Sequence, residues 1–251
     1  MAKLFNARLL ANVCSFLPIY PTTTPTDILG ADFIGAARAT NKHLADAAVK
    51  RFHHSVKSAG VEGHSRVMEA TVFNAAKTIA EVARCHDLVI LGQAKPDEWD
   101  VEQIVETVLF GSGRPLLLVP YIQKTPMAFR CASVCWDGSR AAARALGDAM
   151  PFLRRAEGVH LLTITTGDAQ LNREHGDIGS HLARHGVNAK VRRLDSSNGG
   201  EVSTILNHVS DSGTDFVVMG GYGHNRLREF ILGGVTRGML ASMTVPVLMS
   251  H

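Results

Sequence analysis

Residues 217–223 read Val-Val-Met-Gly-Gly-Tyr-Gly, and a second glycine pair, Gly233-Gly234, follows after a further nine residues. An apolar run that ends in glycines predicts a buried strand leaving a sheet, and residues 235–242 have the pattern of a helix. Glycine permits positive φ and lets a ligand approach the main chain closely. The free N–H groups at a helix start attract anions, phosphates above all. The stretch therefore predicts that the backbone on the two sides of one loop binds a polyphosphate.

The spacing Gly220-x2-Gly223-x9-Gly233 resembles the ATP-binding signature of the universal stress proteins. In that family a Ser or Thr usually follows the third glycine, whereas this chain has Gly234 there, so one hydroxyl contact to phosphate is missing. The expected strand before the loop, the helix after it and the closing apolar run at residues 245–249 strengthen the match. The alternative interpretation is a glycine-rich turn without a ligand.

The composition is that of an ordinary globular protein, because 45% of the 251 residues are hydrophobic. The net charge of +3 does not indicate a nucleic-acid partner. No apolar run reaches transmembrane length, and the first residues do not read as a signal peptide. The scattered Cys14, Cys85, Cys131 and Cys135 have no metal-ligand spacing and are expected to be reduced core thiols. We therefore expect a cytoplasmic protein without a metal site.

Strand and helix patterns alternate along the whole chain, which predicts βαβ units and a parallel sheet. The strand patterns lie at residues 8–14, 64–68, 87–92 and 114–120, and then at 132–139, 159–165, 187–194, 215–219 and 245–249. The segments between most of them have helical spacing of apolar residues.

The two halves of the chain repeat each other. Residues 8–13 match 160–165, residues 87–92 match 215–220, and residues 114–119 match 244–249 with a small offset. The duplication resembles a tandem universal stress protein, and the resemblance covers nearly the whole chain. It implies an α/β fold with two tandem doubly wound parallel-sheet domains, Rossmann-like with strand order 3-2-1-4-5, at residues 1–122 and 128–251.

The first half departs from this pattern in two ways. It has no counterpart of residues 132–154, and in the family that opening strand is the centre of the sheet. An empty central position would orphan two rows of backbone groups, so we expect that an upstream strand and helix were lost, or that the first domain is rearranged or swapped. The loop at residues 92–98 lacks the Gly-x2-Gly pattern and carries acidic residues that repel phosphate. This half is therefore not expected to bind ATP.

The resemblance also implies which residues form the site, at the switch point of strand order beyond the carboxyl ends of the strands. Cys135, Trp136 and Asp137 would line the adenosine side, and Ile164 would cover the base. The other implied nucleotide-binding residues are Met219, Gly220, Gly223, Gly233, Gly234, Val235 and Thr236. For Asp137 the alternative role is to cap the following turn.

Arg226, Arg228 and Arg237 lie near enough in sequence to neutralise a triphosphate, and the alternative is that they are solvated surface arginines. Mg²⁺ is expected to accompany ATP, but no pair of carboxylates is dedicated to holding it. The chain lacks the Gly-x-Ser-x-Gly and P-loop motifs. We expect no enzymatic activity beyond slow, incidental ATP hydrolysis.

These observations predict an ATP-binding stress-response regulator or nucleotide sensor with one site in the second half. The alternative is a nucleotide-free interaction scaffold of the same fold, in which Gly234 records a lost site. A less favoured alternative is an adenine-nucleotide-using enzyme. In the family the closing strands mediate dimer contacts, so residues 116–119 and 245–249 are expected to pair the two halves as a pseudo-dimer or to form a homodimer. No nucleic-acid or membrane partner is expected.

Overall fold

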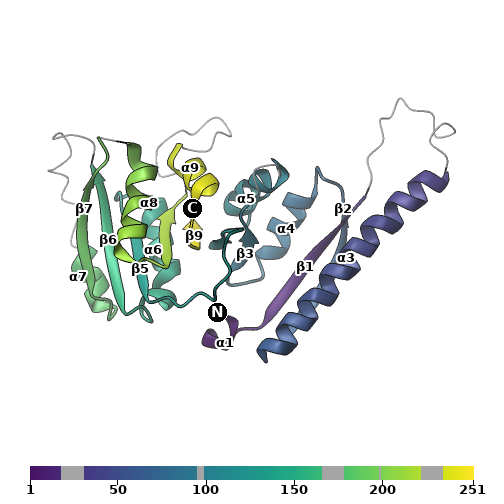
Figure 1. The fold of residues 1–251 in the computed structure, drawn as a ribbon, viewed down its shortest axis with the longest axis horizontal. Helices are drawn as coiled ribbons and strands as arrows, with labels where there is room; N and C mark the ends of the chain where they lie inside the picture. The colour runs from purple at the N-terminus through teal and green to yellow at the C-terminus, as the bar shows by residue number, and fades with distance from the viewer. Residues whose placement is uncertain (18–30, 95–98, 166–177, 198, 222–233) are drawn as a thin grey trace. The chain divides into compact units, whose positions relative to one another are not determined.

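The computed structural model describes residues 1–17, 31–94, 99–165, 178–197, 199–221 and 234–251. These residues form two compact units, Met1–Ile79 and Ala80–His251. The units meet in sequence within helix α4 (Ala75–Ala83). Strands and helices alternate in both units, which confirms the predicted α/β class (Figure 1).

The first unit is a pair of parallel strands packed against a long helix. It contains α1 (Ala2–Phe5), β1 (Leu9–Phe16), α3 (Ala31–Ala59), β2 (Gly63–Ala70) and the first part of α4. Strands β1 and β2 pair along their full length, from Leu9 opposite Gly63 to Phe16 opposite Ala70. Helix α3 contacts both strands and connects them as a crossover, because parallel strands cannot be joined by a tight turn.

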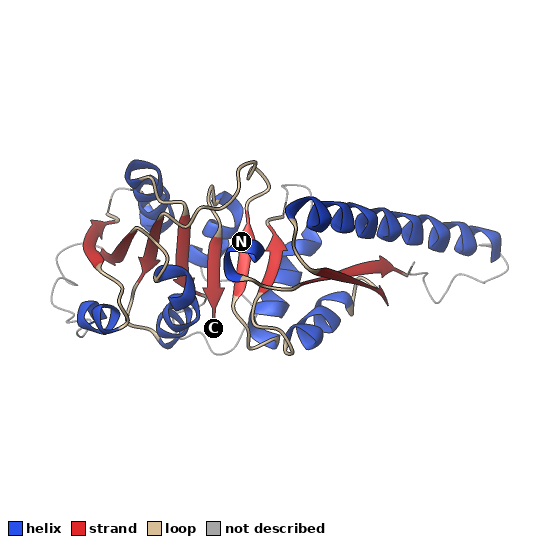
Figure 2. Cartoon of the chain, turned by 90° about the horizontal axis from the view of Figure 1, so that it is seen from below, coloured by secondary structure: helices blue, strands red, loops and turns tan. Residues whose placement is uncertain are grey.

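The second unit is a seven-stranded sheet with helices on both of its faces (Figure 2). The strands follow the order β3-β4-β9-β8-β5-β6-β7. The strands are β3 (Val89–Gly92), β4 (Leu116–Val119), β5 (Cys131–Cys135), β6 (Gly158–Thr165), β7 (Ala189–Asp195), β8 (Phe216–Gly220) and β9 (Val247–Ser250). The helices are α5 (Trp99–Gly111), α6 (Arg140–Leu153), α7 (Ile178–Arg184), α8 (Gly200–Ser212) and α9 (Gly234–Ser242).

The second half of the chain forms the predicted doubly wound sheet. Its strands lie in the order β7-β6-β5-β8-β9, all parallel, which is the order 3-2-1-4-5 when they are numbered within this half. Strand β5 lies at the centre, and its Ala132 and Val134 are buried, as an apolar run flanked by strands on both sides requires. The alternation of strand and helix patterns predicted the parallel α/β class of this half, and the strand order is the one that the family resemblance implied.

Strands β4 and β9 join the two halves of the repeat. They pair antiparallel, with Leu116 opposite Met249 and Leu118 opposite Val247. All four of these side chains are fully buried. Each strand would otherwise present a short apolar edge, and such an edge exposes unpaired N–H and C=O groups. The expected pairing of the two halves through their closing strands is thus present within one chain.

The four strands of the first half are divided between two sheets. Strands β1 and β2 form a sheet of their own, whereas β3 and β4 extend the sheet of the second half. Within the described residues, no strand of the first half takes the place that β5 has in the second half. Residues 80–122 belong to the same compact unit as residues 128–251, so the domain boundary expected near residue 122 stays a prediction about the sequence repeat.

Candidate functional site

The candidate site lies where strands β5 and β8 run side by side. They pair in parallel from Ala132 opposite Phe216 to Val134 opposite Val218, so their carboxyl ends meet at the same edge of the sheet. From β5 the chain builds β6 and β7 on one side and then crosses to build β8 and β9 on the other. Ligands of doubly wound sheets bind at this kind of switch point.

A tight turn leads from β5 into helix α6. The Ser139 N–H donates to Asp137 Oδ1 at 2.9 Å, and the Ala142 N–H donates to Ser139 Oγ at 3.1 Å. Ser139 is therefore the N-cap of α6. Asp137 takes the turn-capping role that the sequence had left open, and it uses one of its two carboxylate oxygens for this contact.

Gly220 ends β8 directly against the first turn of α6. A Cβ atom at this position would lie 2.5 Å from the Ala142 nitrogen and 2.7 Å from the Ala141 carbonyl carbon. Real Cβ atoms essentially never approach other heavy atoms this closely, so only glycine fits. The first glycine of the motif thus brings the end of β8 to the amino end of α6, where backbone N–H groups lack intrahelical partners.

The next glycine is held at the edge of the sheet by β9 and the residue after it. The Gly221 N–H donates to the Ser250 carbonyl at 2.8 Å. The Gly221 carbonyl lies 3.1 Å from His251 Nδ1. The described part of the glycine loop is therefore anchored at its start.

Gly234 begins α9, and the described residues leave open space around it. Among them, no heavy atom lies within 4 Å of an ideal Cβ at this position, apart from its chain neighbours and the backbone of its own helix. The following residues turn inward, since Val235 is half-buried and Thr236 is buried. With respect to the described residues, a hydroxyl side chain would fit at residue 234, so their packing does not require the glycine that replaces the usual Ser or Thr.

The expected adenosine side is formed by the end of β5 and the adjoining strand β6. The Trp136 backbone N–H donates to the Leu162 carbonyl at 2.8 Å, whereas its indole Nε1 is buried and has no acceptor among the described residues. Ile164 is half-buried near the end of β6. Burial, followed by the charge of Asp137, raises the pKa of the Cys135 thiol to about 12. The thiol is therefore neutral at physiological pH.

Of the other residues predicted for the site, some lie within the described chain and some do not. Met219 is 4% exposed within β8. Gly223, Arg226, Arg228 and Gly233 lie outside the described residues, so their part in the site stays a prediction.

Gln93 contributes to this region, although the sequence did not point to it. Its buried side chain donates from Nε2 to the Leu240 carbonyl at 2.9 Å and to the Ala241 carbonyl at 3.2 Å. Its Oε1 accepts from the Tyr121 N–H at 3.3 Å. Gln93 thereby caps the carboxyl end of α9, the helix that follows the glycine loop. The signal available in the sequence was a polar residue directly after an apolar strand and its glycine.

A second polar cluster lies near the amino end of β6. His160 Nδ1 and His208 Nε2 are 3.1 Å apart and link β6 to α8. Burial lowers the pKa of both histidines, and the neighbouring positive charge of His208 lowers that of His160 further. The two rings therefore pair best in their neutral forms.

The described parts of the chain have neither a metal-binding cluster nor a membrane-spanning helix. There, no group of three or more His, Cys, Asp and Glu side chains is placed to hold a metal ion. Over the same residues, no helix combines the length and the apolar character needed to cross a membrane.

Comparison with known proteins gives a consistent family relationship. The model of the universal stress protein family matches residues 132–251. A curated universal stress protein of Synechocystis sp. is 24% identical over 202 residues, which are 78% of this chain and 68% of that protein. Among solved structures, a universal stress protein from Archaeoglobus fulgidus matches with a TM-score of 0.70 and 15% identity, covering 97% of this chain and 86% of the other. This structural likeness supports the fold.

Proposed function

Residues 132–251 match the universal stress protein family, and on this premise we propose that the second half of the chain binds ATP and acts as a nucleotide-dependent stress-response regulator. The observation that carries the proposal is the contact of Gly220 with the first turn of α6, at the switch point between β5 and β8. This contact brings a glycine-rich strand end beside a helix amino end, and both favour phosphate.

The residues at the switch point fit a nucleotide. In the proposed site, the phosphates lie between the amino ends of α6 and α9, where the helix dipoles favour negative charge. The first intrahelical bond of α6 is donated by Ala143, so the N–H groups of Arg140 and Ala141 have no intrahelical acceptor. The open space at Gly234 leaves room for phosphate beside α9. Mg²⁺ accompanies ATP in this proposal and shields the phosphate charge.

The adenosine would lie over the ends of β5 and β6. Trp136 places a buried indole N–H without a described acceptor at this end of the sheet, and a buried donor of this kind gains from a ligand acceptor. The proposed nucleotide-binding residues within the described chain are Cys135, Trp136, Asp137, Ile164, Met219, Gly220, Gly234, Val235 and Thr236.

The proposal is for binding and sensing rather than catalysis. The thiol of Cys135 at the end of β5 stays protonated, because burial raises its pKa to about 12. One carboxylate oxygen of Asp137 already accepts a hydrogen bond from the Ser139 N–H in the turn into α6. Neither group is therefore poised as a nucleophile or general base.

One observation favours the alternative of a nucleotide-free scaffold. Gly234 replaces the hydroxyl residue usual in the family, although the space around it would admit one. The change thus removes a phosphate contact without a packing benefit at that position. If the protein is instead a nucleotide-free scaffold, the other residues of the site do not bind ATP either.

A charge substitution at Gly234 tests the two functions against each other. The Gly234→Asp variant meets no steric obstacle and places a favourable carboxylate at a helix start, so we expect unchanged or slightly higher thermal stability. The same carboxylate repels phosphate, so ATP should bind at least about tenfold more weakly, a loss of about 1.4 kcal/mol. Calorimetric titration with Mg·ATP measures the ATP affinity of the native protein and of Gly234→Asp.

Gly147→Asp is the matched control. Gly147 also has open space around its Cβ position, and it lies in the middle of α6, away from the helix start. It makes the same charge change, and ATP affinity should stay as in the native protein. If the native protein gives no heat with Mg·ATP, the scaffold replaces the nucleotide site. If both Asp variants bind ATP as tightly as the native protein, the phosphates do not lie beside Gly234.

A further inference from the structure

Helix α5 of the first half packs against the start of the glycine loop of the second half. An ideal Cβ at Gly221 would lie 2.6 Å from Leu109 Cδ2, so the tip of this leucine lies directly on the Gly221 main chain. Leu109 is 3% exposed, and its packed surroundings leave it little room to move aside. The backbone of Gly221 does not have a positive φ. Among the described residues, the feature that requires a glycine at position 221 is therefore the contact with Leu109.

The next residue of α5 contacts the same glycine through a histidine. The rings of Phe110 and His251 meet edge to face, with their centroids 4.6 Å apart. His251 Nδ1 donates to the Gly221 carbonyl at 3.1 Å, since a carbonyl oxygen can only accept. Helix α5 therefore holds Gly221 in two ways, directly through Leu109 and by way of the His251 ring.

The first half also contacts α9, the helix that follows the glycine loop. Gln93 comes directly after β3 and is 7% exposed, and it donates to the Leu240 and Ala241 carbonyls in the last turn of α9. Helix α9 has only nine residues and is rigid over that length. A contact that holds its last turn therefore also determines where Gly234, at its amino end, lies.

The internal repeat relates these two contacts to each other. Gln93 and Gly221 each directly follow the glycine that ends a strand, β3 in one half and β8 in the other. Leu109 and Leu240 each stand six residues before the proline that precedes β4 or β9. In both halves, the residue after the strand thus contacts the matching position in the helix of the other half. The contacts differ in kind, because Gln93 bonds to the main chain whereas Gly221 accommodates the Leu109 side chain.

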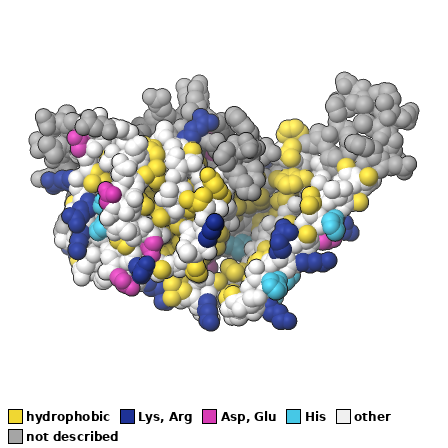
Figure 3. Space-filling view, viewed as in Figure 1, with side chains coloured by type: hydrophobic (Ala, Val, Ile, Leu, Met, Phe, Trp, Pro, Cys, Tyr) yellow, Lys and Arg dark blue, Asp and Glu magenta, His cyan; other side chains and the backbone are white. Residues whose placement is uncertain are grey.

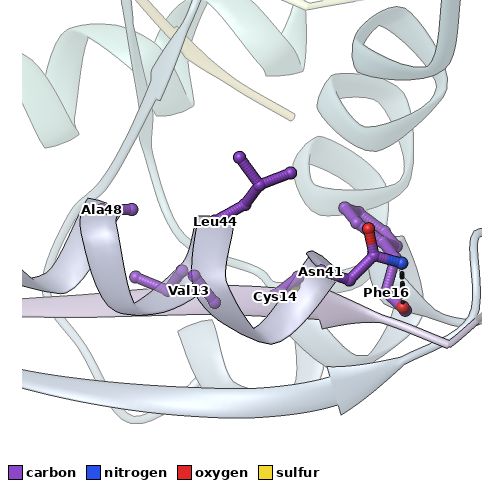
Figure 4. Close-up of a pocket in the computed structure, with 7 residues that line it drawn as sticks. Val13, Cys14, Phe16, Asn41, Leu44 and Ala48 are labelled. Atoms are coloured by element: carbon purple, nitrogen blue, oxygen red, sulfur yellow. Dashed lines mark hydrogen bonds between the residues drawn. The ribbon is translucent and has the colours of Figure 1, made fainter. Parts of the chain in front are cut away.

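The groove in the first unit has a different character from the nucleotide site. It has a volume of about 240 Å³ and lies between β1 and α3, where Val13, Leu44 and Ala48 are among its lining residues (Figure 4). The Asn41 side chain in this lining donates to the Phe16 carbonyl at 2.7 Å. Basic and histidine side chains of α3 are exposed on the face seen in Figure 3, and no described one lines the groove. The described lining therefore offers a triphosphate no positive charge.

We propose that the first half of the chain positions the ATP site of the second half, with Leu109 and Gln93 as the positioning residues on the two sides of the glycine loop. This role presupposes the ATP site proposed above and adds what controls its affinity. Displacement of α5 frees Gly221 and lowers the affinity for ATP. Because coupling between two sites is reciprocal, ATP bound in the second half in turn stabilises α5 in the first half.

Leu109→Ala tests the positioning role on the full-length protein. Truncation leaves a void beside Gly221, so Mg·ATP should bind at least about fivefold more weakly in calorimetric titration. Leu182→Ala is the matched control, because Leu182 in α7 is also buried, at 0% exposed. It lies just before β7 begins, near the amino ends of the strands and away from the switch point. This control should bind ATP as the native protein does, and circular dichroism checks that both variants are folded.

A double variant shows whether Leu109 acts through Gly221. The Cβ of Gly221→Ala meets the Leu109 side chain, so this single variant should bind ATP more weakly. Combining it with Leu109→Ala should restore part of the affinity, because the new methyl group takes the vacated space. Two independent losses would instead add, and the double variant would then bind more weakly than either single variant.

Hydrogen exchange tests the coupling on the native protein, without any variant. Saturating Mg·ATP should slow exchange at the amides of α5 more than at those of α7. If the native protein does not bind Mg·ATP, the ATP site and the positioning role fall together. If it does bind, but Leu109→Ala binds ATP as tightly as Leu182→Ala, the ATP site stands and the positioning role is overturned. Unchanged exchange in α5 overturns it as well.

Discussion

Replacing Gly220 by alanine should break the contact on which the site is built. The added Cβ would lie 2.5 Å from the Ala142 nitrogen and 2.7 Å from the Ala141 carbonyl carbon, and both are backbone atoms of a helix that cannot swing aside. Overpacking of this kind costs about 1–3 kcal/mol. Alanine also lowers the conformational entropy of the unfolded chain, which stabilises the folded protein by about 0.4–1 kcal/mol. We therefore expect the free energy of unfolding to fall by about 1–2 kcal/mol.

Gly234→Ala is the matched comparison, because its Cβ would meet open space. Only the unfolded-chain term acts there, so its stability should equal that of the native protein or exceed it by up to about 1 kcal/mol. Urea unfolding followed by circular dichroism gives the midpoint and slope for each protein. The reasoning is refuted if Gly220→Ala is as stable as Gly234→Ala, since β8 would then not press against the start of α6.

Three further predictions follow from single contacts. Burial lowers the pKa of His160 and His208 below the value of the unfolded chain, so their contribution to stability is fully present above about pH 6.5 and is lost as the pH falls through the folded-state pKa values. Urea unfolding should therefore give a lower free energy of unfolding at pH 5 than at pH 7. This difference between the two pH values should be smaller in His208→Gln. Cys135 should resist alkylation by iodoacetamide at pH 8 while the exposed Cys85 reacts, as peptide mass spectrometry would show, and rapid labelling of Cys135 would contradict its raised pKa. Gln93→Ala leaves two carbonyls of α9 without their donor, so the free energy of unfolding should drop by about 1–3 kcal/mol, and an unchanged urea midpoint would show that the cap is dispensable.

Much of the second half was predictable because its signals are local. The apolar run that ends at Gly220 marks a strand, and Ser139 marks a helix start. Each signal lies within a few residues of the feature it sets, and both features are present in the structure. The pairing of the closing strands, which the structure also has, was implied by the family resemblance. The order of the strands came from the family resemblance, because periodicity does not distinguish one order of parallel strands from another.

Other features depend on contacts between distant residues and left little trace in the sequence. Gln93 bonds to carbonyls nearly 150 residues away, at Leu240 and Ala241, and a single polar residue after a strand does not announce such a partner. The motif spacing assigned Gly220 to phosphate, whereas the structure gives it a packing role against α6. Both roles can hold together, because the packing is what places the glycine beside the helix start.

The first half shows that a strand pattern does not determine which sheet a strand joins. Its apolar runs predicted strands correctly, yet β1 and β2 separate from β3 and β4 into different sheets. Hydrophobic periodicity defines which residues form a strand but not which neighbour the strand finds. Leu10 and the buried Leu162 occupy matching positions of the repeat, each directly after another leucine, so the 40% exposure of Leu10 could not be predicted from this pattern.

The central claim is that ATP binds at the switch point of the second half, and the affinity of Gly234→Ser for Mg·ATP tests it most directly. The added hydroxyl fits without steric cost and supplies a hydrogen bond to a charged group, worth about 1.5 kcal/mol. Calorimetric titration should therefore show one ATP per chain, bound about tenfold more tightly than by the native protein. Unchanged affinity in this variant, or no binding by either protein, would contradict the claim.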